Sequence, residues 1–262
     1  MAIRVAVVGA GGRMGSEVVR LVEAQTDMKV AAAVEAAAVV QSGAVVAGRR
    51  LTAELEPALT ECDVAVDFSV AEAVERNAVI AVRAGRPLVC GVTGLSETAM
   101  SGLRRAAQSI PVVYAANFSV GVAALVRLAE TAARLLGRGF DAEVVEVHHR
   151  GKKDAPSGTA RLLAEIVMQA RDGGTVRQGR DGVVGPKPEG EVGISAVRTG
   201  DVVGEHLVIF GGTGERIELS HRAQSRAAFA AGVVKAIRFA HGRSPGWFGM
   251  ADVLAAEGGP GR

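Results

Sequence analysis

The sequence has few cysteines, no excess of charge of one sign and no long apolar run. Its only cysteines, Cys62 and Cys90, are spaced neither as metal ligands nor as a redox pair. We therefore expect two buried thiols in a reducing compartment, and no metal site. The 30 basic and 28 acidic residues leave a net charge of +2, which argues against a nucleic-acid partner or a polybasic membrane surface.

Glu, Arg or Gly residues interrupt every apolar segment before it reaches the length that spans a bilayer, so no membrane segment is expected. The amino-terminal stretch MAIRVAVVGAGG lacks the basic region and the cleavage site of a secretory signal. We expect an untargeted cytoplasmic protein. Hydrophobic residues make up 48% of the chain and charged residues 22%, which is typical of a globular protein with a buried core.

The first half of the chain alternates short β-branched runs with helical patterns. Such alternation predicts parallel strands joined by right-handed helical crossovers, and so a doubly wound, Rossmann-type domain. Ligands of such sheets bind beyond the carboxyl ends of the strands. Strands are predicted at 3–8, 28–34, 64–68, 88–92 and 112–115, with helices following residue 15 and over 71–84 and 96–107.

The second half has strands that follow one another with little between them. This pattern predicts antiparallel pairing in an open, mixed sheet of a separate α+β domain. The expected elements are helices over 121–136 and 159–170, strands over 140–148, 193–198, 205–210 and 215–221, and a glycine-rich segment over 172–190. Helices over 227–240 and 250–255 are expected to return to the first domain. The predicted protein is thus α/β, with a doubly wound domain followed by a separate α+β domain.

A glycine-rich turn follows the first strand. Gly9, Gly11 and Gly12 allow the backbone to approach a pyrophosphate, and Gly15 allows the next helix to pack closely on the strand. Glu35 ends the second strand, where an acid accepts hydrogen bonds from the adenosine ribose. The alternative is that the turn needs glycine only for packing and that Glu35 is simply solvated. The two features together favour dinucleotide binding.

A second group of charged residues ends the strand over 140–148. Two histidines, an arginine and two lysines fall within residues 148–153, and Ser157-Gly158-Thr159 then begins a helix whose amides favour an anion. Adjacent strand residues point to opposite faces, so only one of His148 and His149 faces the site unless the strand has already ended. An imidazole, an ammonium group and a helix start in one segment favour a dianion site over a solvated loop.

These motifs resemble those of the 4-hydroxy-tetrahydrodipicolinate reductase (dihydrodipicolinate reductase) family over nearly the whole chain. The run His-His-Arg-x-Lys-x-Asp-Ala-Pro-Ser-Gly-Thr is highly specific to that family. The matching segments are VGAGGRMG at 8–15, GVTG at 91–94, ANFSVG at 116–121, EVHHRGKKDAPSG at 146–158, RTGDVVGEH at 198–206 and ERIELSH at 215–221.

The resemblance implies hydride transfer from NADH or NADPH to a cyclic dicarboxylate, with loss of water, in lysine and diaminopimelate biosynthesis. It implies that Lys152 is the general acid and that His148 polarises the substrate or relays a proton. Substrate carboxylates would be held by His149, Thr93, Gly158 and Thr159. Cofactor contacts would come from Gly9, Gly11, Gly12, Arg13, Met14, Gly15, Glu35, Gly91, Thr93, Ala116, Asn117 and Phe118. Two rival hypotheses are another oxidoreductase of the aspartate family and a catalytically inactive dinucleotide sensor on the same fold.

The resemblance also implies a dinucleotide-binding domain over 1–117 plus 229–262 and a substrate-binding and oligomerisation domain over 118–228. It further implies domain closure about hinges near Asn117 and Phe229, and a homotetramer built through the carboxyl-terminal domain. Two departures from the family pattern concern the cofactor. Ala36 follows Glu35 where many members have a basic residue for the 2′-phosphate of NADPH, and Val92 stands where a second threonine is common. We therefore predict the use of both cofactors with a modest preference for NADH.

Overall fold

The computed structural model describes residues 1–257 and divides the chain into two compact units. Unit 1 comprises Met1–Val120 and Arg226–Arg262, and unit 2 comprises Gly121–Ser225. These limits lie within a few residues of the expected domain limits. Residues 258–262, which we assigned to the dinucleotide-binding domain, lie outside the described part of the chain.

Unit 1 is built on a six-stranded sheet in the order β13-β7-β6-β5-β1-β2, and every pairing in it is parallel. The predicted doubly wound domain is therefore confirmed. The sheet also contains a strand near the carboxyl end of the chain that the sequence did not indicate. The strands are β1 (Ile3–Val8), β2 (Met28–Val34), β5 (Val64–Asp67), β6 (Leu88–Cys90), β7 (Pro111–Tyr114) and β13 (Gly246–Phe248).

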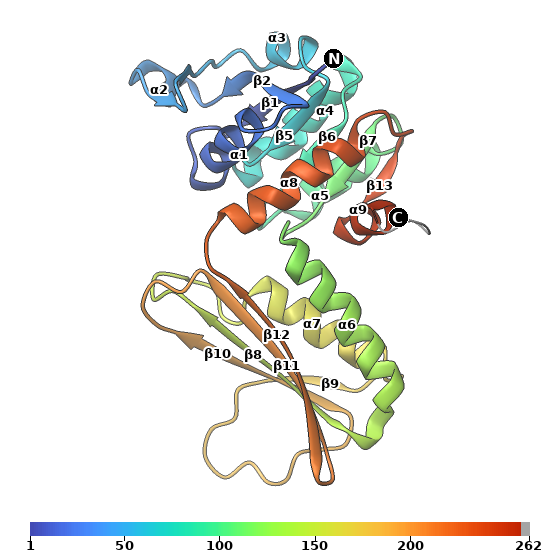
Figure 1. The fold of residues 1–262 in the computed structure, drawn as a ribbon. Coiled ribbons are helices and arrows are strands. Elements are labelled where there is room, and N and C mark those ends of the chain that lie inside the picture. The colour runs from blue at the N-terminus through green and yellow to red at the C-terminus, as the bar shows by residue number, and fades with distance from the viewer. Residues whose placement is uncertain (258–262) are drawn as a thin grey trace. The chain divides into compact units, whose positions relative to one another are not determined.

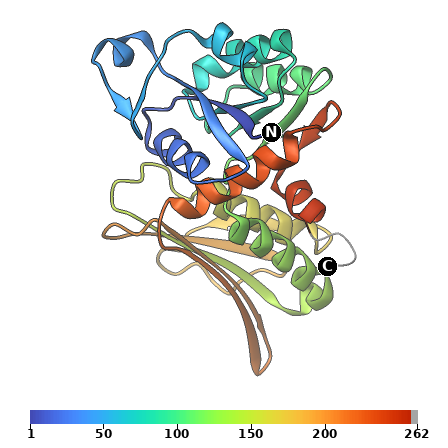
Figure 2. The same ribbon diagram turned by 45° about the horizontal axis from the view of Figure 1, so that its top comes forward.

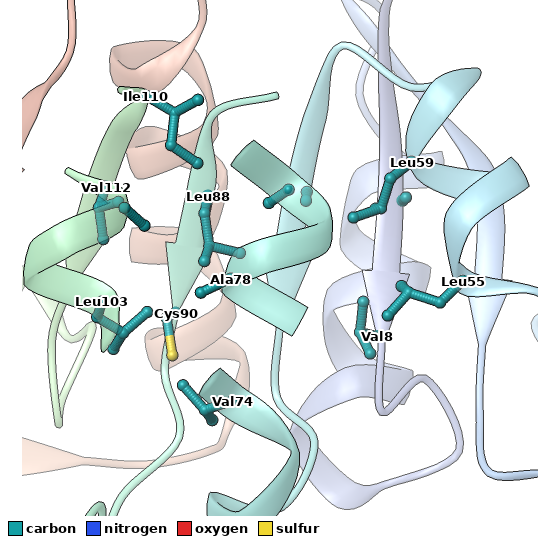
Figure 3. Packing of buried hydrophobic residues seen from close by; sticks show 14 of the residues in the cluster. Val8, Leu55, Leu59, Val74, Ala78, Leu88, Cys90, Leu103, Ile110 and Val112 are labelled. Carbon is teal, nitrogen blue, oxygen red and sulfur yellow. The ribbon is translucent and has the colours of Figure 1, made fainter. Parts of the chain in front are cut away.

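Helices cover both faces of this sheet (Figure 1). On one face, α1 (Arg13–Glu23) packs against α8 (Ala227–Ala240), although about 200 residues separate them in sequence (Figure 2). On the other face lie α3 (Leu55–Thr60), α4 (Val74–Ala84) and α5 (Glu97–Ala106), whose apolar side chains interlock with those of the strands (Figure 3). The remaining elements are α2 (Ala37–Gln41), the β3 (Val45–Val46) and β4 (Arg49–Arg50) hairpin, the short 3-10 turn η1 (Ala71–Ala73) and α9 (Met250–Glu257), which packs on α8.

Unit 2 is a five-stranded sheet in the order β12-β11-β8-β10-β9, with helices on one face (Figure 1). Its apolar core joins that face of the sheet to the two helices. The strands are β8 (Asp141–His148), β9 (Thr175–Gln178), β10 (Glu191–Arg198), β11 (Gly204–Gly212) and β12 (Glu215–Ala223). The helices are α6 (Val120–Leu136) and α7 (Gly158–Gln169), with the 3-10 turn η2 (Gly137–Gly139) after α6.

The predicted mixed sheet is present, but only some of its strands pair antiparallel as expected. β11 pairs antiparallel with β8 and with β12, whereas β10 pairs parallel with both β8 and β9. The helical crossover through α7 returns β9 in the same direction as β8, and the segment 179–190 returns the chain once more before β10. β9 lies in the glycine-rich segment for which no strand was expected. None of the helices within residues 1–257 is both long enough and apolar enough to span a bilayer.

Candidate functional site

The residues expected to bind a dinucleotide follow the carboxyl ends of parallel strands of unit 1. The glycine turn follows β1 and Glu35 follows β2, while Gly91 and Thr93 follow β6, and Ala116 to Phe118 follow β7. Because these strands are parallel, their carboxyl ends share one edge of the sheet, which is where ligands of doubly wound folds bind. The sheet thus brings together segments that lie far apart in the sequence.

The glycine turn leaves no room for side chains at two positions. Gly9 has a φ of +75°, and a Cβ there would lie 2.5 Å from the carbonyl oxygen of Phe68. A Cβ on Gly15 would lie 2.0 Å from the carbonyl oxygen of Gly9, because α1 begins directly against the turn. Gly12 caps α1 without a side-chain hydrogen bond, so backbone amides form the start of the helix. Such a backbone cradle fits a pyrophosphate.

Glu35 reaches back to this turn from the end of β2. Its Oε1 accepts a hydrogen bond from the Gly11 amide at 3.1 Å, and its Oε2 accepts one from its neighbour, the Ala36 amide, at 2.8 Å. The carboxylate therefore lies beside the glycine turn. Arg13 and Met14 open α1, with Arg13 exposed and Met14 half-buried.

An aromatic pair supports the neighbouring loops. A Cβ on Gly91 would lie 2.2 Å from the ring of Phe68, and that ring meets Phe118 edge to face with centroids 6.0 Å apart. Asn117, just before Phe118, accepts a hydrogen bond from the Ser119 amide at 2.8 Å. Thr93 is exposed, whereas Val92, one of the two departures from the family pattern, is buried in the apolar cluster of unit 1.

A buried ionic network stands where β8 ends in unit 2. Glu146 and His148 are two residues apart on β8 and therefore share one face of the sheet. Glu146 is fully buried, and its Oε2 lies 2.5 Å from Nδ1 of His148. Arg198, the register partner of His148 on β10, donates from both terminal nitrogens to the two oxygens of Glu146 at 2.8 Å.

A fourth donor completes the shell of Glu146. The Ser157 amide donates to Oε1 of Glu146 at 3.0 Å. Burial alone would raise the pKa of Glu146, but the hydrogen bonds from Arg198, His148 and Ser157 outweigh it and lower that pKa below its usual value. Burial lowers the pKa of His148, and the opposing attraction of Glu146 offsets only part of that effect. At neutral pH the pair is thus a carboxylate beside a neutral imidazole.

His206 adds a second imidazole to the network from β11. It is the register partner of Glu146 and meets the ring of His148 edge to face, with centroids 5.3 Å apart. Its Nε2 lies 3.2 Å from Oγ of Ser157. Burial, together with the nearby His148, lowers the pKa of His206 to about 4, so this ring is neutral at physiological pH.

The loop after β8 carries the other predicted residues. His149 lies just past the strand, and its carbonyl oxygen accepts a hydrogen bond from the Lys152 amide at 3.1 Å, which closes a turn. The Nζ of Lys152 lies 2.8 Å from Oδ1 of Asp154, whose side chain is 60% exposed. An ion pair this exposed contributes little free energy and is easily opened.

The loop ends at the start of α7. Oγ of Ser157 accepts a hydrogen bond from the Ala160 amide at 3.2 Å and so caps the helix. Gly158 is exposed, and no atom lies within 4 Å of the position where its Cβ would be. Gly158 and Thr159 therefore present the positive end of the helix dipole next to open space, which suits a carboxylate.

Unit 2 thus brings together His148, His149, Lys152, Gly158 and Thr159, whereas Thr93 belongs to unit 1. Sequence reasoning assigned no role to Glu146, Arg198 or His206, and it placed Ser157 only at the anion-binding start of the helix. The strand period is a signal that could have placed Glu146 on the face of His148, but only the pairing of β10 and β11 with β8 brings in Arg198 and His206. Within residues 1–257, no group of three or more His, Cys, Asp or Glu side chains is arranged to hold a metal ion.

Comparison with protein families gives two matches that together span nearly the whole chain. Residues 3–118 match the amino-terminal model of dihydrodipicolinate reductase, and residues 121–254 match its carboxyl-terminal model. The chain is 43% identical over 267 residues to the 4-hydroxy-tetrahydrodipicolinate reductase of Anaeromyxobacter dehalogenans (strain 2CP-1 / ATCC BAA-258), with 98% of this chain and 99% of the relative covered. It is 45% identical to that of Myxococcus xanthus (strain DK1622), with 97% and 98% covered.

Among solved structures, the chain is similar to a dipicolinate-bound dihydrodipicolinate reductase from Paenisporosarcina sp. TG-14. The TM-score is 0.81 at 26% identity, and the match covers 97% of this chain and 100% of the other. The similarity therefore extends over the folds of both units.

Proposed function

Because the chain belongs to the dihydrodipicolinate reductase family, we propose that it reduces 4-hydroxy-tetrahydrodipicolinate to tetrahydrodipicolinate, with loss of water, in lysine and diaminopimelate biosynthesis. It is an NAD(P)H-dependent oxidoreductase. The observation that carries the proposal is the segment 148–159 of unit 2, where a neutral imidazole, an ammonium group and a helix start follow one another. A cyclic dicarboxylate that must be held and protonated needs these groups.

The glycine cradle of unit 1 would hold the cofactor. The fit rests on the turn itself, where a Cβ on Gly9 or Gly15 would collide with the backbone and where α1 begins without a side-chain cap. When bound, a reduced nicotinamide supplies the hydride. Arg13 and Met14 open α1 beside this cradle, and Gly91, Thr93 and Ala116 to Phe118 line the same strand edge.

Lys152 is proposed as the general acid. When the substrate binds, the ammonium group leaves the exposed Asp154 and contacts the substrate instead, since opening such an ion pair costs about 1 kcal/mol or less. His148 polarises the ring or relays a proton beside it. His149 and the amides of Gly158 and Thr159 hold the carboxylates, and the part assigned to Thr93 rests on the family resemblance alone.

We propose that both cofactors are used, with a modest preference for NADH. Glu35 lies at the glycine turn, where it would accept hydrogen bonds from a free ribose diol and repel a 2′-phosphate. Ala36 supplies no compensating cation. Arg13 is exposed and would pair with the 2′-phosphate, so NADPH remains a substrate.

A homotetramer through unit 2 and a cytoplasmic location complete the proposal. β12 and β9 are the edges of the sheet of unit 2, and Val197 and Ile217 are exposed on its strands, which supports burial against other copies. Cys62 and Cys90 are buried free thiols, as expected in a reducing compartment. Light scattering coupled to size-exclusion chromatography measures the oligomer directly.

The deciding experiment couples the purified protein to a synthase that makes the dicarboxylate from pyruvate and aspartate semialdehyde. Oxidation of NADH or NADPH, followed at 340 nm, is expected only when both synthase substrates are present. Binding of NADH without any turnover would instead support the dinucleotide-sensing alternative.

A further inference from the structure

Glu146 is the most enclosed charged group near the proposed site, and no motif reasoning gave it a role. It is fully buried, and its three hydrogen-bonding neighbours come from three different parts of unit 2: His148 from β8, Arg198 from β10 and Ser157 from the start of α7. A buried carboxylate with that many donors is rigid, and removal of its charge leaves several donors without an acceptor.

The donors on Glu146 decide the protonation of His148. Arg198 and the Ser157 amide are donors only, and together they lower the pKa of Glu146, so the carboxylate is ionised. An ionised carboxylate only accepts hydrogen bonds. At 2.5 Å from Oε2, the Nδ1 of His148 must therefore carry the proton, and in the neutral ring Nε2 must carry the lone pair.

The opposite edge of the ring is also shaped by the fold. Nε2 of His148 lies over Gly204, where a Cβ would come within 3.0 Å of it. A glycine at this position, the first residue of β11, leaves room for the imidazole edge that bears the lone pair. The ring is thus fixed at Nδ1 by a charge and given space at Nε2 by the absence of a side chain.

The same carboxylate also fixes the start of α7. Ser157 donates its amide to Glu146 and caps α7 with its hydroxyl group, which also contacts His206. Displacement of Glu146 would therefore move the imidazole and the anion-binding end of the helix together.

We propose that Glu146 is a positioning residue that holds His148 as the Nδ1-protonated tautomer, with Nε2 as its proton-accepting atom, and ties that ring to the start of α7. The proposal rests on the proposed reductase function, because it assigns the protonation state of a residue in that site. Arg198 is the countercharge that keeps the carboxylate ionised, and it also donates to the Asp154 carbonyl oxygen at 2.6 Å.

The groups that face His148 predict how its titration responds to Glu146. Burial, Lys152 and Arg198 lower its pKa, Glu146 raises it, and the neighbouring ring of His206 is neutral. Glu146→Gln removes the only one of these groups that favours the imidazolium. The acid limb of the kcat/KM profile that reports His148 is therefore expected to move to lower pH by roughly one unit.

The first measurement is the tautomer of His148 in the wild-type protein. Magic-angle-spinning NMR of 15N-histidine-labelled protein, with the signal assigned by its loss in His148→Asn, is expected to show a neutral ring protonated at Nδ1. A ring protonated at Nε2 would overturn the proposal. This measurement needs no variant of Glu146 to fold and no turnover, so its failure is distinct from failure of the proposed function.

The second measurement compares Glu146→Gln with Glu191→Gln in the coupled assay. Glu191 is a buried carboxylate at the start of β10 that is paired with Arg180, so its loss is a matched structural change away from His148. We expect kcat to fall at least tenfold and the acid limb to move only in the Glu146 variant. Equal effects of the two substitutions, or a wild-type pH profile in Glu146→Gln, would show that Glu146 serves stability alone. Absence of turnover in the wild type would contradict the proposed function and leave the NMR result to decide the tautomer.

Discussion

The Glu35 carboxylate accepts a hydrogen bond from the Gly11 amide, with 3.1 Å between Oε1 and N. Glu35 directly follows β2 and Gly11 lies in the turn after β1, so the pairing of these two strands sets the contact. This contact holds the negative charge of Glu35 beside the proposed ribose site. The preference between NADH and NADPH therefore depends on whether a nearby cation balances that charge.

Arg13→Ala is expected to weaken the binding of NADPH more than that of NADH, because only NADPH has a 2′-phosphate that pairs with the guanidinium group. An exposed arginine contact is worth about 1 kcal/mol or less, so the change in relative kcat/KM should be at most about fivefold. Arg20→Ala is the control, since Arg20 lies on the same helix but is paired with Glu17. A wild-type preference for NADPH of roughly a hundredfold, about 2.7 kcal/mol, would contradict the role given to Glu35.

Lys152→Ala is expected to lower kcat by roughly a hundredfold or more and to leave dinucleotide affinity almost unchanged. The reason is that it removes the proton donor and leaves the glycine cradle of unit 1 intact. Lys153→Ala is the matched control, because Lys153 is the next residue and is exposed. Stopped-flow turnover and fluorescence titration with NADH measure the two quantities, and wild-type turnover without Lys152 would remove it from the mechanism.

Pyridine-2,6-dicarboxylate is expected to compete with the substrate, since it presents two carboxylates to His149 and to the amides of Gly158 and Thr159. Its inhibition constant should rise with salt, because charge pairs at a partly exposed site are screened once the Debye length falls below about 10 Å. Pyridine-2-carboxylate, with one carboxylate, should bind more weakly and respond less to salt. An inhibition constant that does not change with ionic strength would count against this carboxylate clamp.

Gly15→Ala is expected to destabilise the protein by about 3 kcal/mol or more and to abolish dinucleotide binding. The new Cβ would lie 2.0 Å from the Gly9 carbonyl oxygen, so the turn and α1 must separate. Gly139→Ala is the steric control, because no atom lies within 4 Å of a Cβ there. Thermal unfolding with and without NADH checks both effects, and a variant as stable as wild type would contradict the close packing of the turn.

Asp63→Asn is expected to lower the free energy of unfolding by about 1 kcal/mol at pH 7, after allowance for the partial exposure of the ion pair. The hydrogen bonds from Arg4 lower the pKa of Asp63 from 3.8 to about 2. The carboxylate therefore stabilises the fold fully above about pH 4, and this contribution disappears as the pH falls towards 2. In urea unfolding from pH 7 to pH 2, the difference in the free energy of unfolding between this variant and the wild type should shrink. The control variant Asp181→Asn, at an exposed position, should not differ from the wild type in its free energy of unfolding.

The sequence determined the parallel sheet of unit 1 and the segments that carry the chemistry. Strand length, glycine placement and helical periodicity are local signals, and β1 and β2 have the predicted limits, 3–8 and 28–34. The segment 146–158 was also identifiable, because an unusual run of ionisable residues is contiguous in the chain. Strand periodicity is also sufficient to put Glu146 and His148 on one face, although no role was predicted for Glu146.

Only the tertiary structure decided which side chains meet those of β8. The parallel register of β10 brings Arg198 beside His148, and the antiparallel register of β11 brings His206 beside Glu146. No local pattern specifies these pairings, because register depends on how α7 crosses the sheet and on which faces are buried. For the same reason β9 and β13 were not predicted, because such short segments form strands only when they can hydrogen-bond to the edge of a neighbouring strand.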